Sequence, residues 1–283
     1  MSENRTFYEL PLSYPTVEDG DIQVLRDIPY VGVDDPGARL DLFLPAAEAP
    51  QDGYIPLLFI HGGPLPASGE RPWPKEWRVF QDYGRLAAAN GMAGVVINHR
   101  YSGYEGLVQA MADVQSALLF LANKGETYHL DQEKRAAWLF SGAGMLLNAL
   151  LADDVPALDC LVAFYPLLDL IHIPQAADIY SDDELMALSP LSQIDRMPSQ
   201  LPMLFARAGL DRPGLNRALD TFVKQALYHN LDLELHNLPQ AAHGFDMFDD
   251  SAAVQDIIER GIEFVKKWVS LSGGQLTADH LTS

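Results

Sequence analysis

The sequence is poor in cysteine and in positive charge. Its 283 residues include a single cysteine, Cys160, so no disulfide can form within the chain, and a zinc ribbon or an iron–sulfur framework is excluded. One thiol fits a reducing compartment, and we expect a cytoplasmic protein. Lys and Arg number 19 against 39 Asp and Glu, a formal net charge of −20. Because nucleic acids and anionic membranes would repel so negative a chain, we do not expect it to bind either of them.

Long apolar runs are also missing. No run reaches the roughly 18 residues that a membrane-spanning helix needs. One of the longest, Cys160 to Leu168, is bounded by Asp159 and Asp169. The first residues, MSENRTFYELPLSYP, lack the basic start and apolar core of a signal peptide. With 48% hydrophobic and 20% charged residues, the composition is that of a soluble globular protein.

Short apolar runs alternate with amphipathic stretches between residues 20 and 270, while residues 1–19 and 271–283 are expected to be loose. The predicted strands are Ile22–Leu25, Leu40–Leu44, Ile55–Ile60, Met92–Asn98, Arg135–Phe140, Cys160–Tyr165, Leu201–Ala208 and Asp232–Asn237. The predicted helices are Pro74–Asn90, Leu107–Lys124, Gly144–Ala152, Leu215–His229 and Ala252–Val269. This alternation predicts a single α/β domain over residues 20–270, with a mainly parallel twisted sheet covered by helices on both faces.

One stretch, residues 169–200, interrupts the alternation. It has no clear strand pattern and many turn formers, yet it carries apolar residues such as Tyr180 and Met186. Substrates enter open α/β sheets at the carboxyl edge of the strands. We therefore expect this stretch to be a short cap over that edge that sets the size of the substrate.

Three segments that can support chemistry each follow a predicted strand. His61-Gly62-Gly63-Pro64 can turn sharply and present backbone N–H groups. Phe140-Ser141-Gly142-Ala143-Gly144 places a serine on a tight turn before a helix, which suits an exposed nucleophile. Ala241-Ala242-His243-Gly244-Phe245 holds a histidine among small residues. Taken singly, each has an ordinary explanation: a glycine turn, a helix-capping serine and a solvated histidine.

Their order along the chain is more informative than any one of them. Serine, then a carboxylate, then histidine, each after a later parallel strand, is the chain order of one type of catalytic triad. Asp211 follows the strand Leu201–Ala208 and is the expected carboxylate. Asp220 would face along the next helix, and Asp246 lies beyond the histidine, so both are read as plain acids.

With these residues the chain resembles the α/β-hydrolase superfamily over about residues 20–270. The resemblance is nearest to esterases whose oxyanion loop reads HGG followed by an apolar residue, a group that also includes formamidases and peptidases. The matching segments are His61-Gly62-Gly63, Ser141-Gly142, Ala208-Gly209-Leu210-Asp211 and His243-Gly244-Phe245.

This resemblance implies a serine hydrolase that cleaves a carboxylic ester through an acyl-enzyme. Ser141 would be the nucleophile, Asp211 the acid and His243 the base, as in the Ser-His-Asp template. The backbone N–H groups of Gly63 and Gly142 would form the oxyanion hole, and His61 and Gly62 would order its loop. The expected partner is a small acyl substrate, and no metal or organic cofactor is needed. The oligomeric state is left open.

The nucleophile segment departs from the usual G-x-S-x-G pattern. Leu139 and Ala143 occupy the two positions that are normally glycine. An alternative register would put Ala143 at the nucleophile position and describe a dead enzyme. We favour Ser141 because it directly follows the strand Arg135–Phe140.

Three further hypotheses remain open. Cys160 could be a nucleophile, as in dienelactone-type relatives, but it begins its strand at the wrong end for the active edge and is more typical of a buried thiol. The enzyme could be an amide or C–N hydrolase, formamidase-like, with the same triad. The unusual Leu139 and Ala143 also leave open a catalytically silent binding protein.

Overall fold

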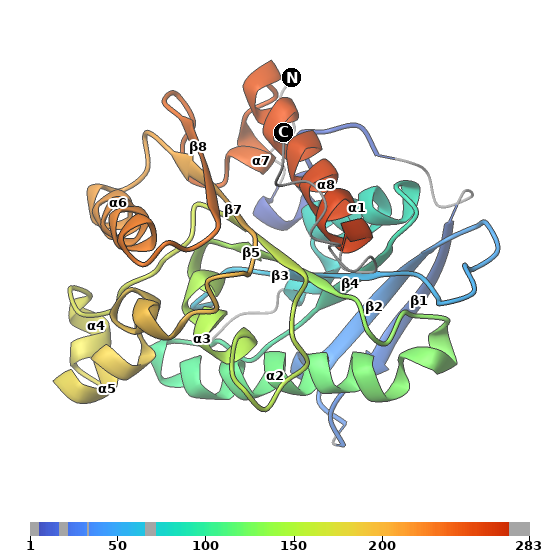
Figure 1. The fold of residues 1–283 in the computed structure, drawn as a ribbon, viewed down its shortest axis with the longest axis horizontal. Coiled ribbons are helices and arrows are strands. Elements are labelled where there is room, and N and C mark those ends of the chain that lie inside the picture. Colours follow the sequence, from blue (N-terminus) through green and yellow to red (C-terminus); the bar gives the residue numbers. More distant parts are fainter. Residues whose placement is uncertain (1–5, 17–21, 33, 66–71, 272–283) are drawn as a thin grey trace, which may run out of the picture.

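The protein contains one eight-stranded, mainly parallel sheet (Figure 1). The computed structural model describes residues 6–16, 22–32, 34–65 and 72–271. The strands are β1 (Ile22–Pro29), β2 (Arg39–Pro45), β3 (Pro56–Ile60), β4 (Ala93–Ile97), β5 (Ala136–Phe140), β6 (Cys160–Phe164), β7 (Met203–Ala208) and β8 (Leu233–Leu238). Their order is β1-β2-β4-β3-β5-β6-β7-β8, and β2 runs antiparallel to both of its neighbours while all later pairs are parallel. The predicted α/β fold class is confirmed.

Helices cover both faces of this sheet, which explains why the central strands are apolar throughout. Two helices, α1 (Arg78–Ala89) and α8 (Ala252–Leu271), pack on one face around Phe59 and Trp138. The other face is covered by α2 (Leu107–Lys124), α3 (Leu147–Leu150) and α6 (Pro213–Tyr228). The shorter helices are α4 (Pro174–Ala177), α5 (Asp182–Leu188) and α7 (Phe245–Phe248). In the described part of the chain, no helix is both long and apolar enough to cross a membrane.

One predicted helix, Gly144–Ala152, is only partly confirmed. The chain forms a 3₁₀ helix, η7 (Ser141–Leu146), and only four residues of α-helix, α3, follow it. A Cβ on Gly144 would lie 2.3 Å from the carbonyl oxygen of Leu167, so the backbone of this turn is pressed against the next loop. This close packing, together with the low helix propensity of glycine, favours the tighter turn. Most other predicted elements differ from the observed ones by a few residues at their ends.

The stretch 169–200 is helical and packed. It contains α4, α5 and a 3₁₀ helix, η8 (Pro190–Arg196). Ser189 is buried and its hydroxyl accepts the backbone N–H of Leu170 at 2.9 Å. The Tyr180 hydroxyl donates to the carbonyl of Tyr104 in another 3₁₀ helix, η5 (Tyr104–Gly106). The segment therefore contacts η5, α3 and α6.

The described part of the N-terminal segment is docked, so the expectation that it is loose is wrong for residues 6–16. The backbone N–H of Ser13 donates to the carbonyl of Asp246 at 2.7 Å, and that of Leu12 donates to the Asp82 carboxylate at 3.2 Å. Leu12 is buried beside α1 and α8 because its apolar side chain completes their core. The rest of the predicted loose termini, residues 1–5, 17–19 and 272–283, lies outside the described residues.

Candidate active site

The three segments singled out in the sequence meet at the carboxyl edge of the sheet. Ser141 follows β5, Asp211 follows β7 and His243 follows β8. These strands are parallel, so their carboxyl ends lie along the same edge, where loops from distant parts of the chain converge.

The side chains of Ser141, His243 and Asp211 form one hydrogen-bonded chain. Ser141 Oγ lies 2.7 Å from His243 Nε2, and His243 Nδ1 lies 2.6 Å from Asp211 Oδ2. The Asp211 side chain is 2% exposed and that of His243 is 28% exposed. A carboxylate that accepts at Nδ1 fixes the imidazole tautomer whose Nε2 can accept a proton. This arrangement can activate a serine hydroxyl on the side that faces solvent.

Ser141 occupies a strained turn. Its φ is +53°, in the left-handed region that residues other than glycine rarely adopt. A Cβ on Gly142 would lie 1.7 Å from the carbonyl oxygen of Gly63, so only glycine fits directly after the serine. Leu139 and Ala143, where glycine was expected, are both buried in the core. The close approaches fall at Gly142 and Gly144 instead, which explains how the turn forms without the usual motif. The core position of Ala143 counts against the alternative register.

Two histidines hold the loop that carries Gly62 and Gly63. His61 Nδ1 donates to the carbonyl of Gly62 at 2.7 Å, and its Nε2 accepts the backbone N–H of His99 at 3.3 Å. His99 Nε2 in turn donates to the carbonyl of His61 at 2.8 Å. Burial lowers the pKa of both rings, that of His99 to about 4. Both are therefore neutral near pH 7, and the loop is fixed by uncharged hydrogen bonds. His99 was not among the predicted site residues. It lies just after β4, and His61 lies just after the neighbouring strand β3, so both are at the carboxyl edge of the sheet.

The two rival carboxylates have other partners. Asp220 pairs with Arg207 at 2.7 Å and is half exposed, as expected of a surface acid. Asp246 is buried and accepts hydrogen bonds from the hydroxyls of Tyr83 and Tyr165. Of the three acids considered, Asp211 is the one bonded to His243.

Cys160 lies away from this site. It is the first residue of β6, at the opposite end of the strand from the active edge, and it is fully buried. Burial raises the pKa of its thiol, which disfavours the nucleophilic thiolate. Its surroundings are those of a core residue.

An apolar pocket of about 260 Å³ opens beside Ser141. Its walls come from several parts of the chain: the N-terminal 3₁₀ helix η1 (Phe7–Glu9), the loop that carries Gly62 and Gly63, the start of α1, the serine turn after β5, the residue after β6 and the loop through α7. The described lining residues are Phe7, Gly62, Gly63, Pro64, Leu65, Trp77, Phe80, Phe140, Ser141, Tyr165, His243, Gly244, Met247 and Phe248. None of these is Asp, Glu, Lys or Arg, so the pocket suits an uncharged group. None comes from 169–200, so the expected cap does not form these walls.

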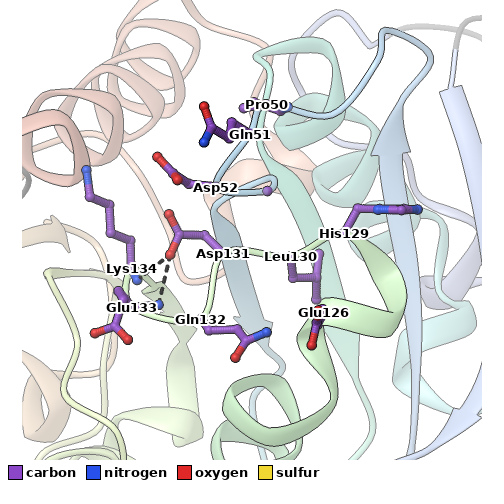
Figure 2. Close-up of a pocket in the computed structure, with 11 residues that line it drawn as sticks. Pro50, Gln51, Asp52, Glu126, His129, Leu130, Asp131, Gln132, Glu133 and Lys134 are labelled. Atoms are coloured by element: carbon purple, nitrogen blue, oxygen red, sulfur yellow. Dashed lines mark hydrogen bonds between the residues drawn. The ribbon is translucent and has the colours of Figure 1, made fainter.

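A second pocket, of about 510 Å³, lies at the other edge of the sheet (Figure 2). It is lined by Pro50–Gly53 before β3 and by residues between α2 and β5. Asp131 points into it but accepts the backbone N–H groups of Glu133 and Lys134 at 2.8 and 3.0 Å. No cluster of His, Cys, Asp or Glu within the described residues could hold a metal ion. This pocket lies at the amino ends of β3 and β5, whereas Ser141 follows the carboxyl end of β5.

Solved structures with similar folds include several esterases. A truncated carbohydrate esterase from gut microbiota has a TM-score of 0.69 and 16% identity, over 93% of this chain and 100% of that chain. Esterase B of Lactobacillus rhamnosis has a TM-score of 0.70 and 14% identity, over 89% of each chain. Esterase 2 of Thermogutta terrifontis, in its apo form, has a TM-score of 0.69 and 21% identity, over 89% of this chain and 96% of that chain.

At such identities these likenesses establish the fold. Among curated proteins, no sequence relative was found. The sequence itself matches the family model BD-FAE over residues 40–209, more than half of the chain. The matched region includes the loop that carries Gly62 and Gly63, as well as Ser141. The chain therefore belongs to the BD-FAE family and has an α/β-hydrolase fold.

Proposed function

We propose that one α/β-hydrolase domain, residues 20–270, hydrolyses carboxylic esters with Ser141 as nucleophile, His243 as general base and Asp211 as the orienting acid. The observation that carries this proposal is the hydrogen-bonded chain from Ser141 through His243 to Asp211, with bond lengths of 2.7 and 2.6 Å. It starts at a strained turn that holds the serine at the carboxyl edge of the sheet.

The reaction proceeds in two halves. His243 takes the proton of Ser141 as Oγ attacks the acyl carbon, and Asp211 stabilises the imidazolium that forms. His243 then gives the proton to the departing alkoxide, which leaves as an alcohol and an acyl-enzyme remains. Water, deprotonated by His243, attacks the acyl-enzyme and releases the carboxylic acid and free Ser141.

The developing oxyanion needs hydrogen-bond donors. We assign this role to the backbone N–H groups of Gly63 and Gly142, whose backbones lie in contact. Pro64 has no N–H, so the next position of the loop supplies no backbone donor. Losing one such donor typically costs about 2.7–4 kcal/mol of transition-state stabilisation. Hydrogen bonds from the neutral rings of His61 and His99 hold this loop in place before the substrate binds.

The pocket indicates the kind of ester. Its aromatic and aliphatic walls carry no formal charge, so one part of the substrate should be small and apolar. At about 260 Å³ it is smaller than the roughly 300–1,000 Å³ that a drug-sized ligand requires. We therefore propose esters with a short apolar group on the side that enters this pocket.

Turnover of the purified full chain tests the proposal. Short-chain aryl esters should be hydrolysed, and Ser141→Ala should lower kcat by about 10⁴-fold or more. Ser116→Ala is the matched control, because the Ser116 hydroxyl bonds within α2. Faster cleavage of arylformamides than of esters would favour a C–N hydrolase. No turnover of either class by folded protein would favour a silent binding protein.

A further inference from the structure

Asp246 is a buried carboxylate that the proposed triad does not use. It is 1% exposed, and each of its two oxygens accepts a tyrosine hydroxyl. Tyr83 donates to Oδ2 at 3.0 Å and Tyr165 donates to Oδ1. Burying a carboxylate is unfavourable unless its oxygens accept hydrogen bonds. The two tyrosine hydroxyls supply these hydrogen bonds to Asp246.

Tyr83 and Tyr165 stay protonated near pH 7, so both hydroxyls can donate hydrogen bonds to Asp246. Burial, reinforced by the charge of Asp246, raises the pKa of both Tyr83 and Tyr165 well above 10. Burial also raises the pKa of Asp246, while the two tyrosine hydrogen bonds and the nearby His243 lower it.

The rings of the two tyrosines have different neighbours. Tyr83 packs in the core, with ring centroids 5.4 Å from Trp138 and 4.8 Å from Phe140. Tyr165 lines the pocket, and its ring centroid lies 4.6 Å from that of His243. One end of Tyr165 is thus tied to Asp246 and its ring supports the imidazole.

The backbone of Tyr165 is strained. Its φ is +40° directly after β6, an unusual value for a residue with a bulky side chain. The same turn continues to Leu167, whose N–H donates to the carbonyl of Ser141 at 2.8 Å. The turn after β6 therefore contacts both the serine turn and the histidine.

We propose that Tyr165 is a positioning residue for His243, fixed in place by its hydrogen bond to Asp246. The inference rests on the proposed function, because it matters only if His243 transfers the proton of Ser141. An imidazole that rests on a fixed ring keeps Nε2 within hydrogen-bond distance of Ser141. A misplacement of about 1 Å can cost up to 10²-fold in rate, so a modest loosening should be measurable.

Tyr165→Phe and Tyr83→Phe form a matched pair in the full-length protein. Each removes one hydroxyl from the same carboxylate and leaves an aromatic ring, so similar losses of thermal stability are expected. Tyr165→Phe should lower kcat for a short aryl ester about tenfold and leave KM within about twofold. Tyr83→Phe should leave kcat within about twofold. Equal effects on kcat, or no effect of Tyr165→Phe, would overturn the proposal.

Rescue at Asp246 gives a second test, which also serves if Tyr165→Phe does not fold. Asp246→Ala removes the acceptor and should lower kcat as Tyr165→Phe does. Asp246→Asn keeps an acceptor oxygen for Tyr165 and should restore most of that loss. If the alanine variant turns over ester at the wild-type rate, Tyr165 does not need its tether and the proposal is wrong.

A spectroscopic measurement separates this inference from the proposed function. The His243 Nδ1 proton shared with Asp211 should give a low-field proton resonance in the wild-type protein. Loss or broadening of that resonance in Tyr165→Phe, and its retention in Tyr83→Phe, would support the positioning role even in a protein without turnover. An unchanged resonance in Tyr165→Phe would count against it. Failure of the proposed function alone would instead appear as an inactive wild-type protein.

Discussion

His61 and His99 stack face to face, with ring centroids 3.6 Å apart and planes 14° from parallel. The two rings are buried, and their hydrogen bonds use both as neutral imidazoles. Two stacked imidazolium ions could not share this position, so the loop that carries Gly62 and Gly63 depends on both rings remaining uncharged.

The stability of the protein should therefore fall in mild acid. The folded pKa of His99 is about 4, below the value of about 6.5 in an unfolded chain. The contribution of neutral His99 to the free energy of unfolding is complete above pH 6.5 and is lost as the pH falls toward 4. The loss is about 1.4 kcal/mol per pH unit for each such histidine. Urea unfolding at pH 7, 5.5 and 4.5 measures the slope.

His99→Gln should remove the contribution of one proton to this slope, about 1.4 kcal/mol per pH unit. Glutamine can still donate a hydrogen bond to the His61 carbonyl, but it cannot titrate. The control is His172→Gln, at an exposed site, which should leave the slope unchanged. An identical slope in wild type and His99→Gln would show that His99 does not titrate in this range.

The acid of the triad is tested by two asparagine variants. Asp211→Asn should lower kcat by roughly 10⁴, because the amide no longer selects the correct tautomer of His243. Asp246→Asn should lower kcat by clearly less than about tenfold, since its amide oxygen still accepts the hydroxyl of Tyr165. Steady-state kinetics on one short ester measures both. If Asp246→Asn lost most of its kcat while Asp211→Asn kept nearly all of it, Asp246 and not Asp211 would be the acid of the triad.

Phe7 should limit the length of the group that enters the pocket. Its ring lies 5.0 Å from Trp77 and 6.0 Å from Phe248, so it closes the outer wall. Phe7→Ala should raise kcat/KM for longer acyl groups relative to acetyl, by about fourfold for each methylene newly buried. Leu227→Ala, at a 70% exposed site on α6, is the control. An unchanged or smaller ratio in Phe7→Ala would exclude a limiting role.

Gly142 should tolerate no side chain. Its Cβ would lie 1.7 Å from the carbonyl oxygen of Gly63, so alanine must displace the oxyanion loop. Gly142→Ala should lower kcat about 10²- to 10³-fold, the usual loss for one oxyanion donor. Gly214→Ala, which has nothing within 4 Å of its Cβ, should be neutral. Normal turnover by Gly142→Ala would mean that the loop does not supply the donors.

Much of the fold could be predicted because the buried strands carry their own signal. β3, β4, β5 and β6 are covered on both faces and read as short apolar runs. Parallel connections then place the residues after each strand at one edge. For this reason, the positions of Ser141, Asp211 and His243 after parallel strands were enough to predict that their side chains lie close together.

The pocket could not be predicted in the same way. Phe7 lies more than 130 residues from Ser141 and reaches it because the N-terminal segment docks through Leu12 and Ser13. Such docking depends on tertiary contacts that no local pattern encodes. The apolar residues of 169–200 suggested a cap, but Tyr180 bonds to the carbonyl of Tyr104 and Met186 is 44% exposed. A role of this segment in substrate size stays a prediction.

The most direct test of the account is covalent labelling with a fluorophosphonate, read by intact mass and peptide mapping. The wild-type protein should gain one adduct, on the peptide that contains Ser141, and His243→Ala should label far more slowly. Ser141→Ala should gain none. A folded wild-type protein that takes up no label, or that carries its adduct on a peptide without Ser141, would contradict the assignment of Ser141 as the nucleophile.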